Sequence, residues 1–145
     1  MVVDEQDLYR LRDAGADAAV LYAALHEPAR ITALRKAARS MRIELLVEVF
    51  TDDDLERALA AESMLIAVSG VDLAGRRDLP RARALLQKIP PGLTPILSGG
   101  FSTPEDLADL LSLIDAVVVM EPLMAAAAAR SPLAAVIEPF TQLVA

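Results

Sequence analysis

The stretch 44-ELLVEVFTDDDLERAL-59 decides the fold class, because it joins an apolar strand directly to an amphipathic helix. Residues 45–50 are apolar except for Glu48. Thr51 supplies a helix cap, and the acids at 52–54 fill the first helical turn, where the helix dipole favours negative charge. The stretch therefore predicts a βα unit that carries one carboxylate in an otherwise buried strand.

The same alternation recurs along the chain. Short apolar runs predict buried parallel strands, because such strands are covered on both faces. They lie at 18–22, 45–50, 64–68, 94–97 and 116–120. Amphipathic segments between them predict helices, and a last helix is expected in the tail. These segments are 5–17, 27–41, 51–63, 78–89, 102–114 and part of 131–145.

Repeated strand–helix units predict an α/β fold with right-handed crossovers and a parallel sheet. With 145 residues and no long linker, the chain is expected to form one domain, residues 1–145. A closed (β/α) barrel needs eight strands and about 250 residues, whereas an open, flavodoxin-like sheet of five strands fits this length. The pattern alone leaves both arrangements open.

Composition excludes several classes of function. A net charge of −7 and 3% aromatic residues disfavour nucleic acid as a partner. There is no cysteine and only one histidine, His26, so the sequence predicts no metal site and calls for no cofactor. No apolar run is long enough for a membrane helix, and no signal peptide opens the chain, so we expect a cytoplasmic protein.

Four segments together resemble indole-3-glycerol phosphate synthase, a family of phosphate-binding (β/α)8 barrels. They are LVEVFTDDDLERAL (46–59), DLYRLRDAGADAAVL (7–21), SGGFSTPEDLADL (98–110) and IDAVVVMEPLM (114–124). The resemblance runs in order over nearly the whole chain. It implies an incomplete barrel of about five to six strands, from the end of the family's third strand to its eighth helix.

The resemblance also implies roles for residues. The family closes an indole ring on a carboxyphenylamino-deoxyribulose phosphate, with decarboxylation and dehydration, which requires a cationic acid, a carboxylate and a phosphate cradle. Glu48 matches the catalytic glutamate of the fifth strand. The third-strand lysine should lie just before Val2, where Met1 stands. In the sixth strand, Ser69 replaces an asparagine and Val71 replaces an arginine.

The last two strands depart from the family in a similar way. The family reads E-S-G in the seventh strand, and here the run is Ser98, Gly99 and Gly100, without the glutamate. In the eighth strand Met120 stands where the family has a glycine, followed by Glu121. The phosphate-binding candidates are therefore Ser98, Gly99, Gly100 and Glu121, and the catalytic candidates are Glu48 and Ser69.

Each candidate also has a purely structural interpretation. Glu48 could be a structural acid at a strand end, and Gly99-Gly100 could be a tight turn that needs glycine's dihedral freedom. His26 is expected at the surface or at a helix start. Asp72 is expected to cap or brace the loop that follows its strand.

Two hypotheses of function follow. The first is a non-catalytic or truncated relative of this tryptophan-biosynthesis family that acts by binding or assembly. The alternative is an active carbon–carbon lyase on a phosphorylated sugar-type substrate, which uses Glu48 and the Gly99-Gly100 loop while a partner chain supplies the missing units. An incomplete barrel exposes strand edges and its inner face, so we expect a homo-oligomer or a complex with a partner chain.

Overall fold

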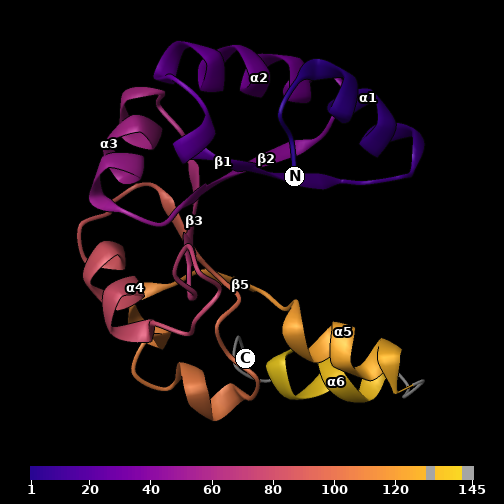
Figure 1. Cartoon of the computed structure of the whole chain (residues 1–145), viewed down its shortest axis with the longest axis vertical. Helices are drawn as coiled ribbons and strands as arrows, with labels where there is room; N and C mark the ends of the chain where they lie inside the picture. The colour runs from indigo at the N-terminus through magenta and orange to yellow at the C-terminus, as the bar shows by residue number, and fades with distance from the viewer. Residues whose placement is uncertain (130–132, 142–145) are drawn as a thin grey trace.

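The computed structural model describes residues 1–129 and 133–141. Over these residues five parallel strands form one sheet in the order β1-β2-β3-β4-β5. The strands are β1 (Ala18–Tyr22), β2 (Glu44–Val49), β3 (Leu65–Ser69), β4 (Thr94–Ser98) and β5 (Ala116–Val118). The sheet is curled and α1 to α4 follow its outer side (Figure 1). The chain is thus an incomplete barrel. The alternative that the sequence left open, an open flavodoxin-like sheet, is not observed.

Helices alternate with the strands. The α-helices are α1 (Glu5–Asp13), α2 (Pro28–Ser40), α3 (Asp52–Ala60), α4 (Leu79–Leu86), α5 (Glu121–Ala128) and α6 (Leu133–Thr141). The 3₁₀ helices are η1 (Ala23–Leu25), η2 (Pro104–Leu107) and η3 (Leu111–Leu113). The predicted strands agree with the observed ones to within two residues at each end. The last predicted helix is α6, and the rest of its predicted range, 131–132 and 142–145, lies outside the described residues.

One predicted helix, 102–114, is wrong. The structure has two 3₁₀ turns there, η2 and η3, in place of a continuous α-helix. The apolar residues Leu107, Leu110 and Leu113 recur every third position. A spacing of three lines up on one face of a 3₁₀ helix, while in an α-helix it drifts around the axis. Leu107 and Leu110 are buried, whereas Leu111, which an α-helix would place on the same face as Leu107, is 40% exposed.

The deciding stretch folds as its sequence predicts. Thr51 is the N-cap of α3, and its side chain accepts the amide of Asp54 at 3.2 Å. The Asp54 carboxylate in turn accepts the amides of Phe50 and Thr51, so strand β2 passes directly into the helix. This reciprocal capping satisfies amides that the first helical turn leaves without partners.

Most of the core lies between the outer face of the sheet and the helices. Strand residues such as Val47, Ile66 and Leu97 are fully buried there against Ile31 and Leu34 of α2 and other helical residues. Alternate strand residues point to the opposite, inner face. A small second cluster lies on that face and consists of Leu46, Ala67 and Ile96, with half-buried neighbours. The fold is therefore held mainly from its convex side.

The sheet begins and ends with β1 and β5. Beside β1, the Val2 amide donates a 2.7 Å hydrogen bond to the Val20 carbonyl, so the residues ahead of α1 touch that edge at one point. At the other end, Ala116 is exposed and Val118 is half-buried. Main-chain groups along such edges are available to a further strand.

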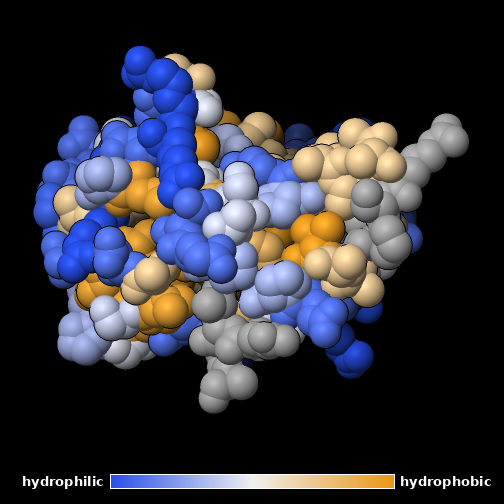
Figure 2. Space-filling view, turned by 90° about the horizontal axis from the view of Figure 1, so that it is seen from below, coloured by the Kyte–Doolittle hydropathy of each residue, from blue (hydrophilic) through white to orange (hydrophobic). Residues whose placement is uncertain are grey.

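α5 and α6 form a helical pair beside the end of β4. Phe140 of α6 is buried against Phe101, with ring centroids 5.6 Å apart. Apolar side chains nevertheless reach the surface on this pair, among them Met124 and Ile137. Figure 2 shows apolar side chains emerging in separate patches between charged ones on the face that it presents. None of the helices in the described part of the chain combines the length and apolarity needed to cross a lipid bilayer.

Candidate functional site

The predicted catalytic residues meet at the carboxyl ends of the strands. Glu48 is the penultimate residue of β2, while Ser69 and Ser98 end β3 and β4 and are partners in the ladder between those strands. All three point to the inner face of the sheet, and only 5% of the Glu48 surface is exposed. The carboxyl ends of strands are where (β/α) barrels place their sites.

Burial controls the charge of Glu48. Loss of water around the carboxyl group raises its pKa above the ordinary value, and the nearby charge of Glu121 adds a smaller rise. Side-chain hydrogen bonding from Ser98 and then Ser69 favours the charged form and offsets part of this effect. The carboxyl group is thus poised to hold a proton at a higher pH than an exposed glutamate does.

A cavity of about 290 Å³ opens above Glu48. Its lining combines aromatic, apolar and acidic side chains with two serines. The residues are Tyr22, Glu48, Phe50, Ser69, Val71, Asp72, Leu73, Gly75, Ser98, Gly99, Met120 and Glu121. Among the described residues no lysine, arginine or histidine lines this cavity. It can therefore accept protons and hydrogen bonds, but it offers an anionic ligand no positive charge.

Two aromatic residues that the sequence analysis passed over form one wall of the cavity. The rings of Tyr22 and Phe50 meet edge to face, with centroids 5.2 Å apart. Burial, together with the Glu48 charge, raises the pKa of the Tyr22 hydroxyl. Tyr22 ends β1 and is opposite Glu48 in the ladder. The strand-end position of Tyr22 is the signal that could have identified it.

Gly99 and Gly100 form a tight turn in close contact with Gly70. Both have positive φ, 64° and 77°, a conformation that glycine adopts without strain. A Cβ on Gly70 would overlap the Gly99 carbonyl oxygen, and a Cβ on Gly100 would overlap the Gly70 backbone. The sequence repeats Ser-Gly at 69–70 and 98–99, and this repeat was the available signal for the contact.

The loop amide that was expected to bind phosphate already has a partner. Gly100 N–H donates a 2.9 Å hydrogen bond to Oε1 of Glu121, the first residue of α5. A carboxylate oxygen therefore occupies the position that an oxygen of a bound anion would take. Gly99 is also close to this side chain, since a Cβ there would lie 2.8 Å from the same oxygen.

The remaining sequence candidates have structural roles. The Asp72 carboxylate accepts the amides of Ala74 and Arg76 at 2.9 and 2.8 Å, so it braces its loop as predicted. His26 lies just before α2, as a helix-start residue would, but it is buried rather than at the surface, and its Nε2 has no hydrogen-bond partner among the described residues. No group of three or more histidine, aspartate or glutamate side chains suited to a metal ion occurs in residues 1–129 and 133–141.

Arg81, which the sequence analysis missed, holds the strand ends together. Its guanidinium donates to the carbonyls of Ser69 and Val71 at 2.7 and 2.6 Å and also to the Phe50 carbonyl. These carbonyls lie at or just after the carboxyl ends of β2, which carries Glu48, and of the neighbouring strand β3. An arginine in the first turn of a helix opposes the helix dipole, and this unfavourable position was the signal that it serves another purpose.

Comparison with known proteins identifies the family. The family model described as Indole-3-glycerol phosphate synthase matches residues 1–136. The chain belongs to the indole-3-glycerol phosphate synthase family. It is 33% identical over 128 residues to the Indole-3-glycerol phosphate synthase of Desulforamulus reducens and 32% identical over 125 residues to that of Caldanaerobacter subterraneus subsp. tengcongensis. These alignments cover 86% and 85% of this chain.

The match covers only part of each relative. Both alignments span 48% of the relative, so the chain spans about half the length of the curated indole-3-glycerol phosphate synthases that it matches. A further relative, the Tryptophan biosynthesis protein TrpCF of Vibrio parahaemolyticus, is 30% identical over 128 residues, which are 86% of this chain and 27% of that protein. The half-barrel seen here agrees with this coverage.

Proposed function

We propose that this chain is a non-catalytic member of the indole-3-glycerol phosphate synthase family that acts in tryptophan biosynthesis through binding or assembly. The observation that carries the proposal is the chemistry of the cavity above Glu48. Its charged lining residues are all acidic: Glu48, Asp72 and Glu121. The family's ring closure needs a cationic acid beside a carboxylate, and the described residues lining this cavity provide only the carboxylate.

The substituted positions support this proposal. Val71 and Met120 both line the cavity. At these sequence positions the family's pattern has an arginine and a glycine. An apolar side chain cannot replace the charge-assisted hydrogen bonds that a guanidinium makes to phosphate. Since groups that stabilise a transition state are each worth orders of magnitude in rate, the combined substitutions favour loss of turnover.

The hydrogen bond from the Gly100 amide to the Glu121 carboxylate is a second observation that supports the proposal. A phosphate that approaches this loop meets a carboxylate already bonded to the amide that it needs. Binding must then displace Glu121 and overcome repulsion from Glu48 as well. We therefore expect phosphorylated ligands to bind weakly at this end of the sheet.

Assembly would cover the surface that the half-barrel leaves open. The edges of β1 and β5 and the half-buried residues Val20 and Val118 on the inner face are suited to contact with further βα units, either in a second copy or in another chain. We expect a homo-oligomer at micromolar concentration. Sedimentation velocity or light scattering checks this, and a stable monomer under those conditions contradicts it.

The catalytic part of the proposal has a direct test. The purified chain is incubated with the carboxyphenylamino-deoxyribulose phosphate, and indole fluorescence of the product is followed in parallel with a Glu48→Gln variant. We expect no turnover above background for either protein. Turnover by the wild-type chain that Glu48→Gln abolishes would show that the carboxylate is catalytic and would overturn the proposal.

A further inference from the structure

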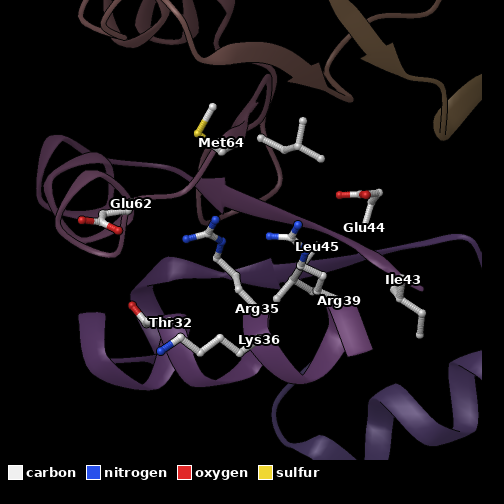
Figure 3. Close-up of a pocket in the computed structure, with 10 residues that line it drawn as sticks. Thr32, Arg35, Lys36, Arg39, Ile43, Glu44, Leu45, Glu62 and Met64 are labelled. Atoms are coloured by element: carbon white, nitrogen blue, oxygen red, sulfur yellow. The ribbon is translucent and has the colours of Figure 1, made fainter. Parts of the chain in front are cut away.

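A second cavity lies at the opposite ends of the strands from Glu48. It has a volume of about 410 Å³ and opens between α2 and the first residues of β2 and β3 (Figure 3). We call it the α2 pocket. Its lining residues are Thr32, Arg35, Lys36, Arg39, Ile43, Glu44, Leu45, Glu62, Met64 and Leu65.

The α2 pocket carries positive charge within a protein whose net charge is −7. Arg35, Lys36 and Arg39 all come from α2, and Figure 3 shows the guanidinium groups of Arg35 and Arg39 directed into the cavity. Among the described residues no carboxylate lies within 4.0 Å of the charged nitrogens of these three side chains. The positive charge is thus available to a ligand.

One of the arginines is held in place by the backbone of a neighbouring helix. Nη1 of Arg35 donates a 2.6 Å hydrogen bond to the carbonyl of Ala61, the C-cap residue of α3. Arg35 is half-buried, so its remaining N–H groups are fixed towards the cavity at little further entropic cost. A preorganised guanidinium binds oxyanions more strongly than one that must first be ordered.

The rest of the pocket limits the kind of ligand. Ile43 and Leu45 are buried and, with Met64 and Leu65, they offer an apolar surface. Glu44 and Glu62 are exposed and lie on either side of the guanidinium groups in Figure 3. A small compact oxyanion can reach the arginines between them, whereas an extended polyanion would meet the two acids.

We propose that the α2 pocket binds a small organic oxyanion, a carboxylate or a phosphate monoester attached to an apolar body. The guanidinium groups of Arg35 and Arg39 can each donate to the oxygens of such a headgroup, and the apolar residues accept the remainder of the molecule. The cavity volume lies within the range of about 300–1,000 Å³ that is usual for small-molecule sites.

This site is separate from the cavity above Glu48. Glu44 begins β2 and Glu48 lies four residues later, which corresponds to about 13 Å along a strand. In (β/α) barrels the amino-terminal face of the strands is ordinarily concerned with stability. The inference therefore does not rest on the proposed function and can fail or succeed independently of it.

The test is a titration of the ¹⁵N-labelled chain with phenyl phosphate, followed by NMR. We expect saturable shifts of the Arg35 and Arg39 Nε–H and Leu45 amide signals, with a Kd of about 1 mM or tighter. Inorganic phosphate, which lacks the apolar body, should bind more weakly, and benzyl alcohol, which lacks the charge, should cause no saturable shift. Absence of saturable shifts with phenyl phosphate up to about 10 mM overturns the proposal.

Two variants with equal loss of charge separate the pocket from general electrostatic attraction. Arg39→Gln removes one guanidinium from the pocket and should weaken phenyl phosphate binding about tenfold. Arg30→Gln is the matched control, because Arg30 also belongs to α2 but pairs with Glu5 outside the pocket; binding should change less than about twofold. Equal weakening by both variants overturns the proposal. Lys36→Gln, at an exposed position, gives an independent second test if Arg39→Gln alters the amide spectrum as a whole.

Discussion

The Gly100 amide is bonded at 2.9 Å to the carboxylate of Glu121, twenty-one residues further along the chain. The contact joins the loop after β4 to the start of α5. It gives the loop the anion that its geometry is able to bind, because a backbone N–H beside glycines of positive φ readily approaches an oxyanion. The carboxylate therefore competes with any external anion at this position.

The first prediction concerns this competition. Glu121→Ala should free the Gly100 amide and remove a nearby negative charge, so that inorganic phosphate binds there about tenfold more tightly than to the wild-type chain. The shift of the Gly100 amide in an NMR titration measures the binding. Glu56→Ala, which removes the same charge from an exposed position on α3, is the control and should leave the affinity unchanged. Equal gains in both variants would mean that net charge alone is responsible.

The second prediction concerns the pH dependence of stability. Burial raises the pKa of Glu48 above 4.5, so above that pH the folded chain still holds a proton that the unfolded chain has released. The contribution of protonated Glu48 to the free energy of unfolding is fully present below pH 4.5. It is lost as the pH rises through the pKa that Glu48 has in the folded state. Glu48→Gln cannot ionise and should be more stable than the wild-type chain at about pH 7, with the difference shrinking towards about pH 4.

Urea unfolding at the two pH values measures that difference. Glu44→Gln is a suitable control because Glu44 lies in the same strand but is exposed. It should change stability little at either pH. A Glu48→Gln variant that is less stable than the wild-type chain at neutral pH would mean that hydrogen bonding from Ser98 and Ser69 outweighs the cost of burial.

The third prediction concerns Arg81. Its guanidinium bonds to the carbonyls of Phe50, Ser69 and Val71, so Arg81→Ala leaves several partly buried acceptors without a donor. Hydrogen bonds to charged groups contribute about 1.5–3 kcal/mol each and are not additive, so we expect a loss of about 2–4 kcal/mol. Chemical denaturation measures this loss.

Arg83→Ala is the matched control, since Arg83 is on the same helix and also donates to one carbonyl, that of Asp109, but is exposed. It should cost less than about 1 kcal/mol. Comparable losses in the two variants would show that the contacts of Arg81 to the strand ends have no special weight.

The fourth prediction concerns the glycine contact. In Gly70→Ala the new methyl group overlaps the Gly99 carbonyl oxygen, so the ends of β3 and β4 must separate, at a cost of about 1–3 kcal/mol or more. The tyrosine and amide signals around Glu48 should shift in the NMR spectrum because the cavity is distorted. Gly15→Ala meets no atom within 4 Å, carries only the strain of its positive φ and lies outside the cavity, so it should leave those signals in place.

The strands were predictable because their sequences are nearly continuous in apolar residues. A buried parallel strand such as 45–50 needs little else to be recognised. The incorrect helix at 102–114 shows the limit of this approach. Thr103 and Pro104 are good helix-start signals, but residues three apart share a face in both helix types, so the spacing of Leu107 and Leu110 does not distinguish an α-helix from a 3₁₀ turn.

The candidate site was predictable where it depends on strand ends. Glu48, Ser69 and Ser98 were identified by position and lie together, since the carboxyl ends of parallel strands share one edge. The bond from Gly100 to Glu121 was not predictable, because the side-chain rotamer across a gap of this length is set by tertiary packing. The role of Arg81 likewise depends on three carbonyls from segments that are separate in sequence.

The strand order has a consequence for how the protein forms. Each strand pairs with the one that precedes it in the sequence, and Ala18 and Glu44 are typical partners. Each pairing closes a loop that contains a whole helix, so it costs more loop-closure entropy than a hairpin, but strands that follow one another keep these loops as short as a parallel sheet allows. During synthesis, each new strand and helix can dock onto the units already outside the ribosome, without waiting for the far end of the chain to appear. At each stage the newest strand is the growing edge of the sheet, and it stays open until the next strand has been made.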